Sequence, residues 1–392
     1  MKNISLSATA QDGLPANAVV RLRAASRRPS SLGSAIRGAI PLSVGEPDSG
    51  TPKDIVEAGV TALRNGRTRY AQLTGLPELQ NALASDLSRR AGRTIDPSQV
   101  VVTHGGSAGL AASVLALINA GDRVLIPEPT YSLYADHLAM VDADTVWVAN
   151  RSDGTLDLER LRHEAPDSRM VILCNPGNPT GRLYSAEELQ ELASILQANP
   201  HLLLLADEAY ADIVYDGLPF FSALQLHSIA DQVIYCNTFS KSYAMTGWRL
   251  GYIVASHERA GAINLVHRSI NGALCTFVQD AGLEALQTPE EVLASQTASY
   301  QERRDIVVQM LSDVPGLSLL PPQGAFYAFP QIATTLTSDE MTQRFAANGV
   351  IVRSGSEFGP SGEGHVRISF ATDRESLIDG MKRFVETVGT IV

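Results

Sequence analysis

The sequence predicts an α/β protein whose larger part is built on a mostly parallel sheet, and three observations support this fold class. Between about residues 100 and 255, short β-branched or aliphatic runs alternate with longer segments of helical period. Several of these runs are apolar at every position, as in strands that helices cover on both faces. A stretch rich in proline and glycine, residues 315–324, introduces a second alternating region. We therefore expect a large domain with its sheet between helices and a smaller α+β domain.

The elements of the large domain follow from this alternation. Six short runs are predicted strands: 100–103, 123–126, 145–148, 170–173, 202–205 and 233–235. Helices are expected between them, near residues 107–119, 131–141, 157–163 and 185–198. The last helix is introduced by Ser185-Ala186-Glu187-Glu188, which has the spacing of a capping box.

The chain is expected to divide into three segments. Residues 1–45 should form an N-terminal arm and part of the smaller domain, residues 46–290 the large domain, and residues 291–392 the C-terminal small domain. The first 40 residues hold scattered Arg, Ser and Ala with little periodicity. They are interpreted as a partly mobile arm or as a segment packed on a partner subunit.

Composition limits the classes of partner. The chain has 392 residues, 44% of them hydrophobic, which is ample for large cores and an enclosed site. A net charge of -11 argues against nucleic acid or an anionic membrane as the main partner. Three widely spaced cysteines, Cys174, Cys236 and Cys275, suggest neither a disulfide framework nor a metal site. Without a leader pattern or a long apolar run, we expect a cytoplasmic protein.

One segment, residues 238–252, carries the most informative chemistry. Lys241 lies there among small and aromatic residues, with Arg249 eight positions further on. Most lysines are simply exposed to solvent. A lysine attacks a carbonyl only as the free amine, so it needs desolvation or a cationic neighbour to lower its pKa, and this segment offers both. We interpret Lys241 as a Schiff-base lysine in an enclosed anionic-ligand site.

The pattern Ser-Lys-x-x-x-x-x-Gly-Trp-Arg-x-Gly, residues 240–251, resembles the lysine motif of the class I/II, fold-type-I pyridoxal-phosphate (PLP) aminotransferases. The match is to their bacterial aspartate-aminotransferase-like branch, and it extends from about Leu42 to Ala371. The resemblance implies the fold-type-I architecture, pyridoxal 5'-phosphate as cofactor, amino acids and 2-oxo acids as substrates, and a homodimer.

A glycine-rich turn follows the first predicted strand. Gly105, Gly106, Ser107 and Ala108 open a helix, where backbone N–H groups and the helix dipole favour a phosphate. Such turns also arise for steric reasons, so this pattern alone leaves phosphate binding open. It matches neither Gly-x-Gly-x-x-Gly nor a P-loop, which argues against a dinucleotide or ATP site.

Three later strand ends carry further candidates, because ligands of open α/β sheets bind beyond the carboxyl ends of the strands. By residue type alone, Tyr131 is a core residue and Asp207 a helix N-cap. The resemblance implies instead that Tyr131 stacks on the pyridine ring and that Asp207 keeps the ring nitrogen protonated. It places Asn178, in Asn-Pro-Thr-Gly, and Tyr210 at the phenolic oxygen of the cofactor.

The phosphate has three more candidate ligands. Arg249 can form a fork of charged hydrogen bonds to it, and Ser240 stands beside the lysine. The spacing of Tyr70 resembles that of a family tyrosine that reaches the phosphate of the neighbouring subunit. The same resemblance implies cis peptide bonds before Pro129 and Pro179.

The substrate has its own candidates near the C-terminus. Arg367 lies in a strand-like run, where an unpaired charge is costly, and it resembles the family arginine that binds the α-carboxylate. Gly45 matches the glycine whose backbone closes that pocket, and Asn178 adjoins it. Arg353 is left with two interpretations: it pairs with a distal carboxylate of the substrate, or it makes a structural salt bridge.

The resemblance implies ping-pong transamination. Lys241 would hold the cofactor as a Schiff base and then move the α-proton, with Asp207 and Tyr210 tuning the cofactor, and the amino group would pass to a second 2-oxo acid. The same residues also suit a PLP-dependent lyase, cyclase or oxidase, or a sensing module without turnover. No metal ligand set is expected.

Overall fold

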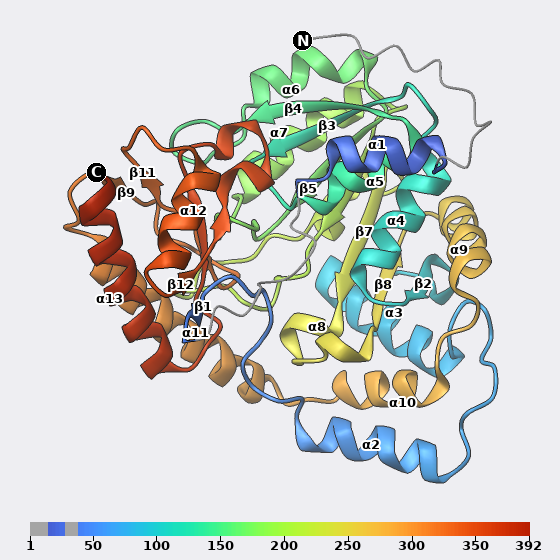
Figure 1. Cartoon of the computed structure of the whole chain (residues 1–392). Helices are drawn as coiled ribbons and strands as arrows, with labels where there is room; N and C mark the ends of the chain where they lie inside the picture. The colour runs from blue at the N-terminus through green and yellow to red at the C-terminus, as the bar shows by residue number, and fades with distance from the viewer. Residues whose placement is uncertain (1–14, 28–37) are drawn as a thin grey trace.

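The computed structural model describes residues 15–27 and 38–392. Its centre is a seven-stranded sheet with the strand order β2-β8-β7-β6-β5-β3-β4 (Figure 1). The strands are β2 (Val100–Thr103), β3 (Arg123–Glu128), β4 (Asp144–Ala149), β5 (Met170–Cys174), β6 (Leu203–Asp207), β7 (Val233–Thr238) and β8 (Gly251–Val254). Only β8 runs antiparallel to its neighbours. The predicted α/β class with a mostly parallel sheet is confirmed.

The six predicted strands all belong to this sheet, and the seventh was missed. β8 has four residues, begins with a glycine and follows the lysine motif without an intervening helical period. It inserts between β2 and β7, so the first and the last strands of the alternating region are not direct neighbours.

The described helices extend over both halves of the chain. They are α1 (Asn17–Ala25), α2 (Lys53–Arg64), α3 (Pro77–Ala91), α4 (Gly106–Leu117), α5 (Leu133–Val141), α6 (Leu158–Glu164), α7 (Ala186–Ala198), α8 (Phe239–Ser242), α9 (His257–Asn271), α10 (Thr276–Ala285), α11 (Glu290–Leu311), α12 (Ser338–Ala347) and α13 (Arg374–Ile391). The capping box predicted at Ser185 is present at the start of α7.

Helices cover both faces of the large sheet, because successive side chains of a strand point to opposite faces. On β5, Val171 and Leu173 belong to a core shared with α3, α7 and α10. Met170 and Ile172 belong to a second core shared with α4, α5 and α9. Burial on both sides explains why the runs are apolar throughout.

A third core lies beside the large sheet and joins α11, α12 and α13 to short strands. These strands form three small sheets: β1 (Ile40–Pro41) with β12 (Val350–Ile351), β9 (Leu317–Ser318) with β11 (Gln331–Ile332), and β10 (Tyr327–Ala328) with β14 (Val366–Ser369) and β13 (Arg353–Ser354). The core takes Leu42, Tyr210 and Tyr300 from the three predicted segments in turn. The boundaries at 45/46 and 290/291 stay a prediction.

Helix α1 packs on α5. Arg21 donates to the carbonyl oxygens of Ala139 and Met140 at 2.9 and 3.0 Å, which satisfies the C-terminal end of α5. The expected mobile or partner-bound arm concerns mainly residues 1–14 and 28–37, which lie outside the described residues.

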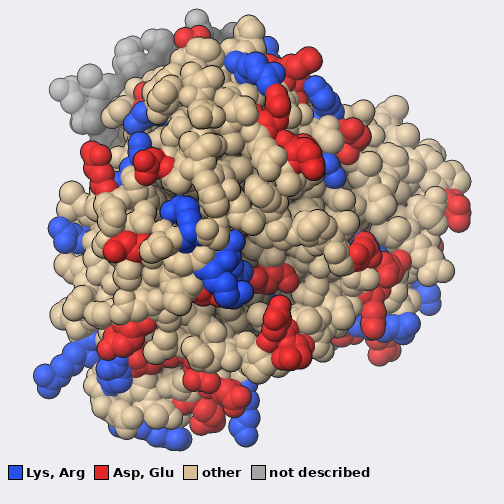
Figure 2. All heavy atoms as spheres, turned by 180° about the vertical axis from the view of Figure 1, so that it is seen from behind, with Lys and Arg blue, Asp and Glu red and all other residues tan. Residues whose placement is uncertain are grey.

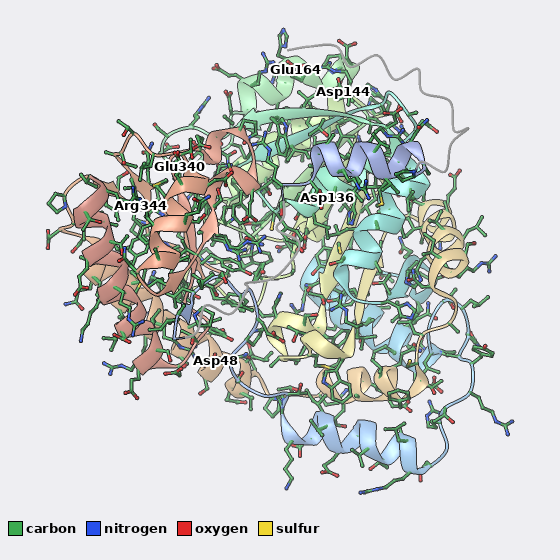
Figure 3. The ribbon with its side chains drawn as sticks, in the orientation of Figure 1. Asp48, Asp136, Asp144, Glu164, Glu340 and Arg344 are labelled. Carbon is green, nitrogen blue, oxygen red and sulfur yellow. The ribbon has the colours of Figure 1, made fainter. Side chains whose placement is uncertain are left out.

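Charged side chains of both signs are interspersed on the face shown in Figure 2. Figure 3 shows Asp144 and Glu164 near one end of the molecule, and both pair with Arg123, at 3.7 and 2.6 Å. None of the helices in the described part of the chain combines the length and the apolar character that a membrane span needs.

Candidate active site

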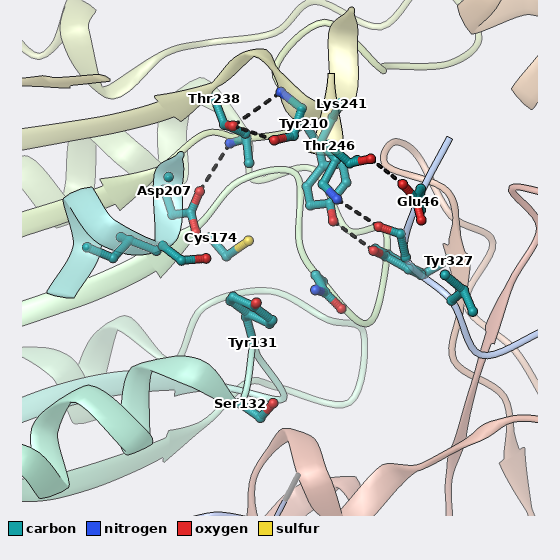
Figure 4. A pocket seen from close by; sticks show the side chains of 18 of the residues that line it. Glu46, Tyr131, Ser132, Cys174, Asp207, Tyr210, Thr238, Lys241, Thr246 and Tyr327 are labelled. Atoms are coloured by element: carbon teal, nitrogen blue, oxygen red, sulfur yellow. Dashed lines mark hydrogen bonds between the residues drawn. The ribbon is translucent and has the colours of Figure 1, made fainter. Parts of the chain in front are cut away.

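A cavity of about 370 Å³ is lined by both the large sheet and the third core (Figure 4). Most of the predicted site residues line it: Gly45, Gly106, Ser107, Tyr131, Asn178, Asp207, Tyr210, Ser240, Lys241, Arg249 and Arg367. Gly105 and Ala108 are neighbours of this lining in sequence and do not belong to it. Tyr70 is not in the lining either and is 94% exposed.

Lys241 lies in the short helix α8, directly after β7. Thr238 caps this helix by accepting a hydrogen bond from the backbone N–H of Ser240. The Lys241 Nζ atom donates to the carbonyl oxygen of Gly45 at 2.7 Å. Burial, with a smaller effect of Arg367 and Arg249, lowers the pKa of Lys241 to about 8, although Glu46 and Asp207 act in the opposite direction. The amine is therefore free in a useful fraction near neutral pH.

Asp207 is the last residue of β6, and its carboxylate is fixed from two sides. Its Oδ2 accepts from the Tyr134 hydroxyl at 2.7 Å, and its Oδ1 accepts from the Ala209 N–H at 3.2 Å. Burial raises the pKa of Asp207, while these hydrogen bonds and Lys241 lower it. Tyr134 was not predicted, because a tyrosine on the apolar face of α5 is typical of a core position.

An anion cradle forms at the start of α4. Its N-cap, Gly105, has φ +78° and supplies no side-chain cap, so the first N–H groups of the helix are left for a ligand. A Cβ at Gly105 would lie 2.6 Å from an Arg249 Nη atom, so only glycine lets the guanidinium approach the helix start. Ser240 adds a hydroxyl to the same cavity. This combination suits a phosphate.

A tyrosine pair and an asparagine form another part of the lining. The hydroxyls of Tyr210 and Tyr327 lie 2.7 Å apart, and Asn178 Oδ1 accepts from Arg367 at 3.1 Å.

The cis bonds predicted before Pro129 and Pro179 are confirmed, and a third, before Pro176, was not predicted.

Arg367 projects from β14. Among the described residues, it donates hydrogen bonds only to uncharged oxygen atoms. It donates to the carbonyl oxygen of Ser43 at 2.7 Å, while its Nε finds no partner there. Its guanidinium carbon lies 4.3 Å from the centre of the Tyr327 ring and 5.1 Å from that of Phe358. A buried cation held by neutral groups is suited to an incoming carboxylate. A Cβ at Gly45 would collide with the Tyr327 hydroxyl, so this side of the cavity needs a residue without a side chain.

Arg353 makes the structural salt bridge that was one of its two interpretations. Its Nε lies 2.9 Å from Glu357 Oε2, and its Nη2 contacts the same oxygen. Both side chains are buried, and Arg353 also lines the cavity. Sequence reasoning missed Tyr327 and Phe358 at this site, since both look like ordinary core aromatics. Glu357, a carboxylate close to Arg353 in the sequence, was a local signal for the salt bridge.

Comparisons with known proteins agree with this geometry. Residues 37–384 match the family model described as aminotransferase class I and II. An aspartate aminotransferase of Pyrococcus horikoshii is 35% identical over 89% of this chain and 90% of its own length. An aspartate/prephenate aminotransferase of Cereibacter sphaeroides is 34% identical over 92% of this chain and 94% of its own.

Solved structures give the same result. The aspartate aminotransferase of Rhizobium meliloti superimposes with a TM-score of 0.86 at 33% identity, covering 91% of this chain and 92% of that one. An aromatic aminotransferase of Pyrococcus horikoshii gives a TM-score of 0.88 at 31% identity, covering 95% and 99%.

Proposed function

The chain belongs to the class I and II aminotransferase family, and from this premise we propose that it moves the amino group of an L-amino acid to a 2-oxo acid with PLP bound at Lys241. One observation carries the proposal. The Lys241 amine, whose pKa is lowered to about 8, shares one cavity with a buried carboxylate, an anion cradle and an uncompensated arginine. These are the groups that a phosphorylated pyridine aldehyde and an amino acid need together.

The residues present fit PLP by their chemistry. The bare start of α4, Arg249 and Ser240 would hold the phosphate, and the ring of Tyr131 offers an aromatic face. Asp207 would pair with the protonated pyridine nitrogen, and Asn178 and Tyr210 would hydrogen-bond to the phenolic oxygen. When bound, PLP supplies an electron sink for the bond that breaks at the α-carbon.

The chain's own residues orient the substrate and move the proton. Arg367 would bind the α-carboxylate, since it projects into the cavity from β14, is buried beside aromatic rings, and donates hydrogen bonds to neutral oxygens. Lys241 Nζ, within reach of the Gly45 carbonyl, would take the proton from the α-carbon and return it to the carbon that was the aldehyde carbon of the cofactor. Asp207 stays in place because Tyr134 and the Ala209 N–H hold both of its oxygens.

The alternatives from the sequence are not favoured. A lyase, cyclase or oxidase would use the same cofactor residues, but the relatives compared above are named aminotransferases. A sensing module without turnover would also keep these residues, but the same relatives are named for amino-group transfer.

The proposal includes a homodimer in which Tyr70 reaches the phosphate of the neighbouring site. Tyr70 is 94% exposed in the single chain, and Leu63 and Leu73 near it are also exposed. Sedimentation at micromolar concentration should give about twice the 41.9 kDa of the chain. A monomer with full activity would rule this part out.

The test of the function is a half-reaction. The purified protein, loaded with PLP, is given single amino acids without any 2-oxo acid. The visible band of the bound cofactor should disappear as one matching 2-oxo acid per site is released, and added 2-oxo acid should restore it. Lys241→Ala should bind PLP without turnover.

Other outcomes would redirect or refute the proposal. Release of ammonia or of an eliminated side chain would move the enzyme to the lyases or oxidases. Absence of any cofactor band after PLP addition would refute the cofactor assignment.

A further inference from the structure

Two buried arginines stand side by side in the cavity. Arg353 on β13 is the direct cross-strand partner of Arg367 on β14, and the two strands are antiparallel. Opposite residues of an antiparallel pair project to the same face of the sheet. Both side chains line the cavity, and both residues are less than 9% exposed. A substrate held by Arg367 therefore has Arg353 close by.

The two arginines differ in their partners. The hydrogen bonds of Arg367 go to a backbone carbonyl and an amide oxygen, so among the described residues no carboxylate is hydrogen-bonded to it. Arg353 directs two nitrogens at one oxygen of Glu357, a carboxylate that is itself only 8% exposed. Of these two arginines, Arg353 is hydrogen-bonded to a carboxylate and Arg367 to neutral oxygens.

The backbone fixes this neutralising contact. Glu357 lies in the short 3₁₀ helix Gly355–Phe358, four residues after Arg353. A Cβ at Gly355 would collide with the carbonyl oxygens of Gly362 and His365, so only glycine permits this tight return. Phe358, the next residue, packs its ring beside Arg367. The same turn therefore places both the carboxylate partner of Arg353 and the aromatic neighbour of Arg367.

We propose that Glu357 is a specificity-determining residue that, by neutralising Arg353, selects amino acids with uncharged side chains over amino acids with a second carboxylate. A side-chain carboxylate near Arg353 meets a carboxylate already in place, and like charges in a buried site repel strongly. A substrate with an amide or apolar side chain meets the Arg353–Glu357 ion pair, which has no net charge. The inference rests on the proposed function and names its substrate class.

A purely structural role for the pair predicts a different result. If Glu357 only relieved repulsion between two adjacent arginines, its loss would lower the activity with every donor equally. The ratio between an acidic donor and its amide of nearly the same shape separates the two roles, because that ratio cancels a general loss.

The experiment compares kcat/KM for aspartate with asparagine and for glutamate with glutamine. In the unmodified enzyme the amide of each pair should be preferred. Glu357→Gln should shift both ratios toward the acid by about tenfold or more. Adding Arg353→Met to this variant should cancel the shift, because the freed cation is then gone. Glu375→Gln, the same charge change at an exposed position of α13, should leave both ratios unchanged.

A binding measurement gives a second readout that does not depend on turnover. Calorimetry with the PLP-loaded enzyme should show succinamate binding more tightly than succinate, and Glu357→Gln should reverse or narrow this difference. If Glu357→Gln does not fold, the unmodified enzyme still decides: a preference for the acid in both donor pairs and in binding overturns the inference. Unchanged ratios in a folded Glu357→Gln overturn it as well.

The two proposals fail in distinguishable ways. If no amino acid converts the bound cofactor, the proposed aminotransferase function fails. If donors react and the acidic ones are preferred, only the role of Glu357 fails.

Discussion

The cavity has two walls of different construction. The wall proposed to hold the cofactor, called the cofactor wall, stands at the carboxyl ends of the central strands and in the turns that follow them; its residues are Gly106, Ser107, Tyr131, Asp207, Tyr210, Ser240, Lys241 and Arg249. The wall proposed to bind the substrate, called the substrate wall, stands mainly on strands of two to four residues and a 3₁₀ turn from the C-terminal part of the chain; its residues are Gly45, Tyr327, Arg353, Phe358 and Arg367, with Glu357 behind them.

The difference shows how one scaffold can keep a cofactor while its substrates change. Members of the cofactor wall are positioned by the hydrogen-bond register of a seven-stranded sheet, which a single side chain cannot shift. Members of the substrate wall come from a three-stranded sheet of short strands, and their side chains are oriented by packing: rings beside a guanidinium, and one carboxylate on another guanidinium. Single substitutions there should alter substrate choice and leave the cofactor bound.

The largest effect that tests this separation is expected for Arg367→Ala. Removing one partner of a buried charge pair costs about 2–5 kcal/mol, so kcat/KM should fall by about 10²- to 10³-fold for every amino acid donor. The affinity for PLP, measured by titrating apoenzyme and following the visible band, should stay within about twofold of the original. Loss of the cofactor together with the substrate would show that the walls are coupled. Arg367→Lys should recover only part of the activity, since an ammonium lacks the planar fork.

The matching change in the cofactor wall is Arg249→Ala. A hydrogen bond to a charged group contributes about 1.5–3 kcal/mol, so PLP should bind about 10- to 100-fold more weakly. Arg249 is an exposed residue in the single chain, which favours the lower end of that range. At saturating PLP the preference between amide and acidic donors should be unchanged. A changed preference would mean that Arg249 also contacts the substrate.

The next effect concerns the pH at which the apoenzyme captures PLP. The pKa of Lys241 is lowered to about 8, so its free amine predominates above that pH and its ammonium below it. The capture rate, followed by stopped-flow absorbance, should rise about tenfold between pH 7 and pH 9 and then level off. An unshifted lysine would give a rate still rising beyond pH 9. Glu46→Gln should move the midpoint lower, because Glu46 favours the ammonium form.

The sequence predicted the cofactor wall far better than the substrate wall, and the reason is geometric. Asp207 and Lys241 follow apolar runs that are recognisable locally, and parallel strands bring their carboxyl ends to one edge whatever the details of packing. Tyr327 and Glu357 become site residues only through contacts between segments far apart in sequence. Nothing local distinguishes Tyr327 from a core tyrosine, and β8 was not recognised because it begins with a glycine and follows the lysine motif without an intervening helical period.

The smallest expected effect is that of Tyr327→Phe, and it probes a hydroxyl contact between the two walls. The hydroxyls of Tyr210 and Tyr327 lie 2.7 Å apart, so the variant removes this hydrogen bond and keeps the ring beside Arg367. A net hydrogen bond contributes about 1 kcal/mol, which predicts a roughly fivefold loss in kcat/KM. Tyr327→Leu also removes the ring under the guanidinium, worth about 0.5–2 kcal/mol, and should weaken donor binding further. Equal losses in the two variants would mean that the hydroxyl alone matters, and that the substrate wall depends on the cofactor wall rather than on its own aromatic packing.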